Sequence, residues 1–314
     1  MPNHQPTGSS KYQVVVALGE VLWDMLPTGP RLGGASANFC ATVGRLGNHA
    51  VLASRIGTDN NGDRLSGLLG ELPIDIGCVQ IDPDRQTGTV TVEINSKGEP
   101  QYRIHEGVAW DAMEFSPSWK ELAVHADAVC FGTLAQRSVL SRAAIQSFIG
   151  ALKPCALRIF DINLRQNYFS EDVVRWSLNH ASILKLNEDE LSIVFQLLNL
   201  PAPSTRDRFR RSLDILLSAF PLQMVCLTLG SDGSLIVTHD DHFRQPGILT
   251  TVSDTVGAGD AFIATITHYA LRNASLVDMS EAANRNAAWV ASQPAAIPDL
   301  WPPPFSERAT ALEA

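Results

Sequence analysis

The sequence predicts an α/β fold in which helices flank a mostly parallel central sheet and a small antiparallel β flap is attached to it. Continuous apolar runs, typical of strands buried on both faces, alternate with segments of helical periodicity along most of the chain. Residues 77–104 are the exception, because three β-rich segments follow one another there without a helix between them. Such strands do not extend a parallel sheet, so they indicate a separate flap.

The composition is that of a globular protein with a large core. The chain has 314 residues, of which 45% are hydrophobic and 18% charged, and we expect a single domain over residues 1–314. The net charge of −9 argues against nucleic acid or an anionic membrane as a partner. The five cysteines include no Cys-x-x-Cys pair, and no apolar run is long enough to be a signal core or to cross a bilayer. We therefore expect a soluble cytoplasmic protein, with loose ends before residue 14 and after residue 298.

The first half of the chain begins with an apolar run at residues 14–18, which predicts a buried strand. Asp24 is expected at or just past the end of that strand, where ligands bind in open α/β sheets, although an exposed loop aspartate fits equally well. Gly-Gly-Ala-Ser-Ala-Asn at residues 33–38 opens an apolar helix, in whose first turn Asn38 can bind a ligand hydroxyl or act as a helix cap. A strand at residues 51–56 and a helix around 65–69 follow.

The flap is predicted from strands at residues 77–81, 87–94 and 101–104, with turns at 82–83 and 97–98. We expect a lid built from about 22–34 and 75–107, since no helix separates these strands. A lid that closes over a site excludes water from it.

The second half returns to the α/β pattern, with a helix at residues 143–152 and a strand at 235–238 that pairs back as an antiparallel edge. The parallel strands are predicted at residues 128–131, 157–162, 183–186 and 225–229. Polar residues and a glycine turn follow these strands, namely Asn163, Arg165, Asn187, Glu190 and Gly230. Because the carboxyl ends of parallel strands share one edge of a sheet, we expect these residues to surround a common site.

The most informative stretch is residues 250–262. Its β-branched residues predict a strand, which is followed by a glycine turn, and the spacing of the apolar residues after the turn predicts a helix. The turn consists of Gly257, Ala258 and Gly259, which leave the backbone N–H groups open at the positive end of the helix dipole. Such a turn is a site for an anion. Neither a Walker loop nor the dinucleotide fingerprint fits, because no Lys follows Gly259 and Phe262 stands where a third glycine is needed.

Asp260 lies in the first turn of that helix, beside the expected anion. On its own it can be explained as an acidic residue that complements the helix dipole. A carboxylate repels a bound phosphate, however, and phosphoryl transfer has a use for one as the proton acceptor of the attacking hydroxyl.

Two of these stretches resemble the signatures of the PfkB family of ribokinase-like carbohydrate kinases. Asp-Thr-Val-Gly-Ala-Gly-Asp at residues 254–260 matches the C-terminal signature, and residues 33–38, followed by Gly44 and Gly47, match the N-terminal one. The resemblance covers roughly residues 12 to 295. It implies a ribokinase-like three-layer sandwich and a transfer of the γ-phosphoryl group of ATP, with Mg²⁺, to a primary hydroxyl of a small sugar. Gly19-Glu20 and the Asp-x-Asn-x-Arg at residues 161–165 look most like fructokinases, so fructose 6-phosphate is the expected product.

The resemblance also assigns roles to matching residues. Asp260 would take the proton of the sugar hydroxyl, and Arg165 would lie near the transferred phosphate. The anion hole would be formed by Gly257, Ala258 and Gly259. The sugar would be bound by Asp24, Gly34, Asn38, Arg103 and Asn163.

Further carried-over residues concern the ions and the nucleotide. Asn187 and Glu190 match an Asn-x-x-Glu motif that organises Mg²⁺, partly through water. Asp254 and the carbonyl of Val256 resemble part of a monovalent-cation site, for K⁺, that some members have. The nucleotide would be bordered by Lys185, Asn187, Thr228, Gly230, Gly233 and Asn286, the last of them near the adenine.

The lid departs from the family pattern, because residues 102–110 lack the usual Arg-x-Gly-Ala-Ala form. Since lid side chains touch the sugar in the family, a kinase for 2-keto-3-deoxygluconate, ribose or a nucleoside is an alternative. An alternative of another class is a non-catalytic sugar or nucleotide sensor, which would not need a base at Asp260. The exposed face of the lid could also pair two subunits into a homodimer.

Overall fold

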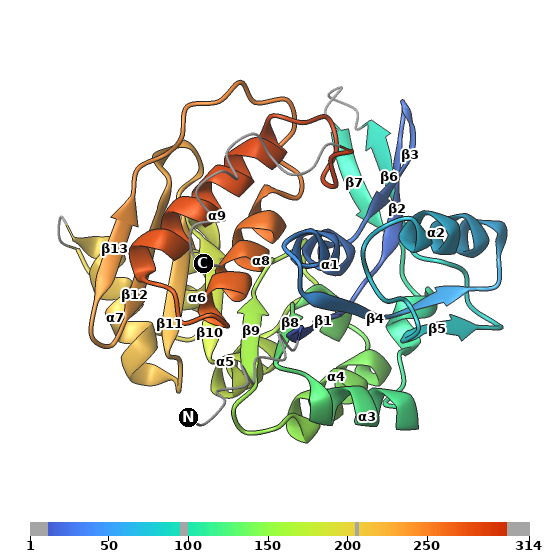
Figure 1. The fold of residues 1–314 in the computed structure, drawn as a ribbon, viewed down its shortest axis with the longest axis horizontal. Coiled ribbons are helices and arrows are strands. Elements are labelled where there is room, and N and C mark those ends of the chain that lie inside the picture. Colours follow the sequence, from blue (N-terminus) through green and yellow to red (C-terminus); the bar gives the residue numbers. More distant parts are fainter. Residues whose placement is uncertain (1–11, 95–99, 205–206, 300–314) are drawn as a thin grey trace, which may run out of the picture.

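One large sheet runs through the middle of the protein (Figure 1). The computed structural model describes residues 12–94, 100–204 and 207–299. Neighbouring strands are parallel from β11 to β5, and β12 and β13 are antiparallel additions. In spatial order the strands are β13 (His242–Gln245), β12 (Ser234–Thr238), β11 (Met224–Thr228), β10 (Ile183–Asn187), β9 (Leu157–Asp161), β8 (Ala128–Phe131), β1 (Val14–Leu18), β4 (His49–Gly57) and β5 (Val79–Asp82).

Helices cover both faces of this sheet, so the protein has three layers (Figure 1). In β1, Val15 and Ala17 pack in the core with α1, α2, α8 and α9, whereas Val16 and Leu18 pack in the core with α3 to α7. A strand buried on both faces must be apolar throughout, which is why the continuous runs predicted these strands correctly. The helices are α1 (Ala35–Arg45), α2 (Asn60–Gly70), α3 (Pro117–His125), α4 (Val139–Ala151), α5 (Glu171–His180), α6 (Glu188–Leu197), α7 (Arg208–Ala219), α8 (Ala258–Ala270) and α9 (Leu276–Ala291).

A second, smaller sheet forms the predicted flap beside α1 and α2 (Figure 1). Its strand order is β3-β2-β6-β7, and its two outer pairings are antiparallel while β2 and β6 are parallel. The strands are β2 (Leu22–Leu26), β3 (Gly29–Gly33), β6 (Thr89–Ile94) and β7 (Pro100–Ile104). The α/β class with an added flap is confirmed.

The boundary of the flap was predicted wrongly. Residues 77–81 were expected in the flap, but β5 pairs parallel with β4 at the edge of the large sheet. Asp24 was expected at the end of the first strand, and it lies instead in the middle of β2, paired with Arg31. Both errors have one cause, because a short strand shows its period in the sequence but not which sheet it joins.

Two predictions near the C-terminus also need correction. Residues 250–256 form no strand, although their β-branched residues favour one, and they reach α8 as irregular backbone. The strand at residues 235–238 pairs back as predicted, but β13 rather than β12 is the edge strand. The predicted turn at 97–98 and most of the two loose ends lie outside the described residues. Among the described helices, none has the length and apolar character needed to span a bilayer.

Three connections between these elements contain a short 3₁₀ helix. These helices are η1 (Ala109–Ala112), η2 (Leu134–Gln136) and η3 (Gly230–Asp232). Two of them begin loops that face the carboxyl ends of the parallel strands, η2 after β8 and η3 after β11. The ends of the parallel strands therefore meet the start of α1, the start of α8 and the small sheet.

The close packing of α1 predicts a difference between two Gly→Ala substitutions. A Cβ at Gly44 in α1 would lie 2.0 Å from the carbonyl oxygen of Pro73, whereas a Cβ at Gly67 in α2 would meet nothing within 4 Å. Gly44→Ala should destabilise the fold by about 1–3 kcal/mol through overpacking. Gly67→Ala should stabilise it by about 0.5–1 kcal/mol through helix propensity. Urea unfolding of both variants measures the difference, and equal stability would contradict the packing described for α1.

Candidate active site

The turn before α8 presents open backbone amides at the carboxyl edge of the large sheet. Gly257 has a left-handed φ of 82°, and a Cβ there would come within 2.6 Å of Ala296, so the turn requires glycine. The N–H of Ala258 is bonded within the turn, but no acceptor among the described residues is bonded to the N–H groups of Gly259 and Asp260. Because these amides lie at the positive end of the α8 dipole, the turn can hold an anionic group.

Asp260 is a buried carboxylate beside these amides. Its Oδ2 accepts a hydrogen bond of 2.8 Å from Nδ2 of Asn38, which joins the first turns of α8 and α1. Burial raises the pKa of Asp260 to about 6, and the negative charge of Asp161 adds to this, while Asn38, Lys185 and Arg165 act in the opposite direction. At pH 7 the carboxylate is mostly ionised and is poised to accept a proton.

A buried ion pair lies beneath the turn. Nζ of Lys185 on β10 donates to Oδ1 of Asp161 on β9 over 3.0 Å. A Cβ on Gly259 would lie only 2.9 Å from this Nζ, so the ammonium packs against the anion-binding turn. Burial lowers the pKa of Lys185, but Asp161, Glu190 and Asp260 outweigh it and the net change is upward. Lys185 was expected at the nucleotide. The structure places its ammonium under the turn, and a contact between Lys185 and the nucleotide stays a prediction.

Asn187 and Glu190 form a reciprocal cap at the start of α6. Oδ1 of Asn187 accepts from the N–H of Glu190, and Oε2 of Glu190 accepts from the N–H of Asn187, both over 2.8 Å. Oε1 of Glu190 accepts from the N–H of Leu164 over 2.9 Å. Burial raises the pKa of Glu190. Each carboxylate oxygen is thus already bonded to the backbone, which suits contact with Mg²⁺ through water rather than a closed cage.

The described residues include no group of three or more His, Cys, Asp or Glu side chains placed to hold a metal ion. Mg²⁺ usually keeps several waters and is bound by one or two carboxylates together with the phosphates of the substrate. A single buried carboxylate at Glu190 therefore fits the ion, provided that phosphates supply most of its ligands.

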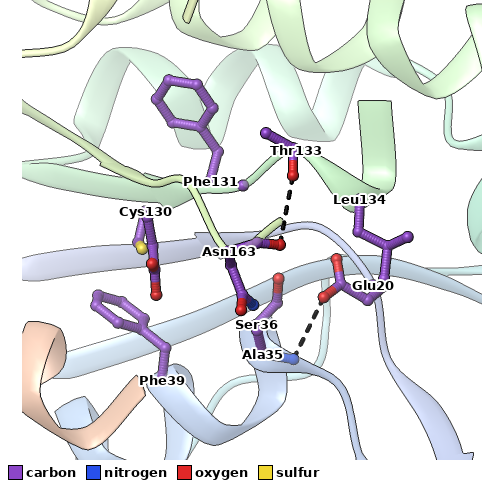
Figure 2. A pocket seen from close by; sticks show the side chains of 11 residues that line it. Glu20, Ala35, Ser36, Phe39, Cys130, Phe131, Thr133, Leu134 and Asn163 are labelled. Carbon is purple, nitrogen blue, oxygen red and sulfur yellow. Dashed lines mark hydrogen bonds between the residues drawn. The ribbon is translucent and has the colours of Figure 1, made fainter. Parts of the chain in front are cut away.

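The loop after β9 brings Asn163 and Arg165 to the same edge. Arg165 is exposed, and its positive charge opposes the rise that burial causes in the pKa values of Glu20, Asp24 and Asp260, so the guanidinium lies near enough to affect these acids. Asn163 has a left-handed φ of 41°, and its carbonyl oxygen accepts from Oγ1 of Thr133 over 3.4 Å (Figure 2).

A small cavity lies between the end of β1, the start of α1 and the loops after β8 and β9 (Figure 2). Its free volume is about 20 Å³, which is room for one water molecule. Glu20 faces it, with Oε1 3.3 Å from the N–H of Ala35. Burial raises the pKa of Glu20 to about 7, and Asp260 raises it further. Besides Glu20 and Ala35, the cavity is lined by Ser36, Phe39, Cys130, Phe131, Gly132, Thr133, Leu134, Asp161 and Asn163.

The small sheet contributes Asp24, which lies on β2. Burial raises the pKa of Asp24 to about 6; Arg165 lowers it and Asp254 raises it, so these charges lie near one another. Oδ1 of Asp254 accepts from the N–H of Val256 over 3.0 Å, which closes a short turn. The pair expected to bind K⁺ is therefore one local turn, and the ion itself stays a prediction.

The other expected residues have different settings. Gly34 caps α1 with a φ of 103°, and a Cβ there would lie 2.6 Å from the carbonyl oxygen of Glu20. Arg103 has an exposed side chain on β7. Thr228 ends β11, and Gly230 and Gly233 follow it with left-handed φ values of 56° and 89°.

Asn286, expected near the adenine, is buried on α9. Its Nδ2 donates to Oγ1 of Thr265 on α8 over 2.9 Å, while its Oδ1 has no partner within the described part of the chain. The side chain thus ties α9 to α8, and a role toward a base stays a prediction.

Sequence reasoning missed Glu20 and Asp161 as members of the site. Glu20 lies two residues after β1 and Asp161 ends β9, so the rule that polar strand ends share an edge already applied to both. Their burial gave no signal in the sequence, because a carboxylate is expected at the surface.

A buried carboxylate beside open helix-terminal amides, at the edge of a sheet flanked by a smaller one, is an arrangement suited to phosphoryl transfer to an alcohol. The chain belongs to the pfkB family of carbohydrate kinases, whose model matches residues 28–302. It is therefore a phosphotransferase that acts on a sugar hydroxyl.

Known proteins resemble the chain over most of its length. It is 26% identical to fructokinase-1 of Zea mays, over 92% of this chain and 94% of the relative. An uncharacterized sugar kinase of Pyrococcus horikoshii in complex with ATP has 24% identity and a TM-score of 0.76, over 90% of this chain and 94% of that one. Fructokinase of Vibrio cholerae O395, in its fructose, ADP and calcium ion bound form, has 21% identity and a TM-score of 0.75, over 91% and 94%. These likenesses confirm the ribokinase-like fold.

Removing the base should abolish most turnover. Asp260→Asn keeps the shape of the side chain and its neighbours but cannot accept a proton, so kcat should fall by at least roughly a hundredfold. Affinity for ATP, measured by calorimetry, should stay near that of the unmodified protein, because the amides of the turn remain. A variant with nearly normal kcat would exclude Asp260 as the base.

The charges around Asp260 predict opposite shifts in pH dependence. Since the base must be ionised, kcat/KM should fall as the pH drops through about 6. Lys185→Met removes a charge that lowers the pKa of Asp260, so this acid limb should move to higher pH. Asp161→Asn removes a charge that raises the pKa, so the limb should move to lower pH.

Breaking one half of a buried ion pair costs about 3–5 kcal/mol, so folding of both variants needs a check by circular dichroism. The double variant Lys185→Met/Asp161→Asn, which removes both charges, is the matched control. Shifts of the two single variants in the same direction would contradict this electrostatic account.

Proposed function

We propose that the protein phosphorylates fructose at its primary 6-hydroxyl with ATP. The single observation that carries the transfer step is the buried carboxylate of Asp260 next to the open amides of Gly259 and Asp260. The relatives named fructokinase, about a quarter identical over most of the chain, support fructose as the acceptor.

In this proposal Asp260 takes the proton of the sugar hydroxyl as the hydroxyl oxygen bonds to the γ-phosphorus. The bond between that phosphorus and the bridging oxygen of ADP breaks, and ADP leaves. The amides of the turn, backed by the buried ammonium of Lys185, stabilise the negative charge on the migrating group. Arg165, whose charge opposes the rise in the pKa of Asp260, adds a second positive charge from the solvent side.

Binding is assigned to the residues around this centre. Asp24, Gly34, Asn38, Arg103 and Asn163 would hold the sugar, and Asn187, Thr228, Gly230, Gly233 and Asn286 would border the nucleotide. Asn187 and Glu190 would hold Mg²⁺ through water, and the ion when bound would neutralise the phosphates. Asp254 and Val256 would hold K⁺. A homodimer through the small sheet is part of the same proposal.

A panel of sugars and nucleosides tests the acceptor. With ATP and Mg²⁺, fructose should give the highest kcat/KM in an assay of ADP formation, ahead of ribose, 2-keto-3-deoxygluconate and nucleosides. Asp260→Asn in the same preparation controls for contaminating kinases. A higher kcat/KM for another compound would replace fructose, and thermal stabilisation by sugar without ADP formation would identify a sensor instead.

A further inference from the structure

The loop that carries Arg165 is bonded to the nucleotide side of the site. Leu164 directly precedes Arg165, and its N–H donates to Oε1 of Glu190 over 2.9 Å. The N–H of Tyr168 donates to the carbonyl oxygen of Arg165 over 3.0 Å, which closes a turn. Gln166 within this turn has a left-handed φ of 49°, a conformation that a side chain such as glutamine adopts rarely. The backbone of Arg165 is therefore fixed at both neighbours.

The same turn is bonded to the small sheet. Nε2 of Gln166 donates to the carbonyl oxygen of Tyr102 on β7 over 2.5 Å. The hydroxyl of Tyr168 donates to Oε1 of Glu106 over 2.7 Å and lies 3.3 Å from the carbonyl oxygen of Ile104, where β7 ends. The bonds to Tyr102 and Ile104 thus join one turn of the main body to β7, the last strand of the small sheet, and the bond to Glu106 joins it to the segment that follows.

The segment after β7 is itself anchored to the body. The guanidinium of Arg137 lies 4.6 Å from the ring centre of Tyr168 and 4.0 Å from that of Trp110. It also binds both oxygens of Asp111 over 2.8 Å and donates to the carbonyl oxygen of His105 over 2.5 Å. The aromatic ring of Tyr168 is held by this cluster, so its hydroxyl meets Glu106 at a fixed place.

We infer that Gln166 and Tyr168 are positioning residues that set the place of Arg165 relative to the small sheet. The side chain of Arg165 is exposed and donates to the carbonyl oxygen of Leu164 in its own loop, so its position depends on that loop. The small sheet contributes Asp24 to the sugar site, and the turn therefore links the sugar-binding sheet to the charge that meets the phosphoryl group. This inference rests on the role proposed for Arg165.

The link also gives a physical reason for the unusual sequence of residues 102–110. This stretch supplies three carbonyl oxygens, one carboxylate and the aromatic ring of Trp110 to the turn and to Arg137. Its residues bond the loop after β9, and they need not follow a pattern that serves sugar contact alone.

A double-mutant cycle tests the inference. Tyr168→Phe removes the hydroxyl and keeps the ring under Arg137, so kcat should fall roughly five- to tenfold, which is the net value of one ordinary hydrogen bond. KM for the sugar should change by less than about twofold, since no sugar contact is lost. Relative to Arg165→Ala alone, the double variant Arg165→Ala/Tyr168→Phe should show no further loss of kcat, because the effect of Tyr168 acts through Arg165.

Glu106 supplies a matched pair of control variants. Glu106→Gln keeps an oxygen that accepts from the hydroxyl of Tyr168 and should retain normal turnover, whereas Glu106→Ala should reproduce the loss seen in Tyr168→Phe. An equal loss of kcat from Tyr168→Phe with and without Arg165 would overturn the inference, and so would unchanged turnover in the single variant.

Amide hydrogen exchange separates this inference from the proposed acceptor. In Tyr168→Phe the N–H groups of residues 164–168 should exchange faster, while those of β10 stay protected. Unchanged protection would overturn the inference even if the enzyme phosphorylates fructose. Faster exchange in a protein that phosphorylates no compound of the panel would retain the structural link and reject the proposed function alone.

Discussion

The hydrogen bond between Asn38 and Asp260 is the contact on which the site depends. It joins the first turns of α1 and α8, the two helices that carry the most informative stretches of the sequence, although the residues are 222 positions apart. Because Oδ2 of Asp260 is held by this bond, the carboxylate has a fixed direction beside the open amides of its own helix. The packing of α1 against α8 therefore fixes the candidate site, and the close contacts at Gly34 and Gly44 let α1 approach the backbone at Glu20 and Pro73.

Placing a carboxylate there creates an electrostatic problem that neighbouring charges solve. Asp260, Asp161 and Glu190 converge in a buried space, and burial together with the negative charge of Asp161 raises the pKa of Asp260 and of Glu190. The ammonium of Lys185 lies among all three and carries a raised pKa as a result. One buried cation thus favours the ionised form of Asp260 while it adds positive potential behind the amide of Gly259, so in the proposed reaction two requirements of phosphoryl transfer would share one residue.

The sequence was sufficient for features that depend on burial and on local backbone chemistry. Strands covered on both faces must be apolar throughout, so the parallel strands could be predicted, and with them the shared edge at which Asp260, Arg165 and Glu190 meet. The neighbour with which each strand pairs could not be predicted from burial or local backbone chemistry. The alternation in β5 suits either sheet, and only the parallel register with β4 decides; the β-branched residues 250–256 find no partner strand at all. Lys185 and Asp161 face each other because β9 and β10 are neighbours, which is a property of topology rather than of spacing.

Backbone conformation shows where the fold accepts strain for the sake of the site. Asn163 and Gln166, on either side of Arg165, both have left-handed φ values, and neither is a glycine. Such residues persist only when surrounding contacts hold them. Here Oγ1 of Thr133 donates to the carbonyl oxygen of Ile162 over 2.7 Å and lies 3.4 Å from that of Asn163, and the side chain of Gln166 donates to β7. The path of this loop carries Arg165 out of β9 and back toward the acids of the site. A relaxed, extended connection from β9 to α5 would not need either conformation, so the two strained residues mark the loop as one shaped by the position of its arginine.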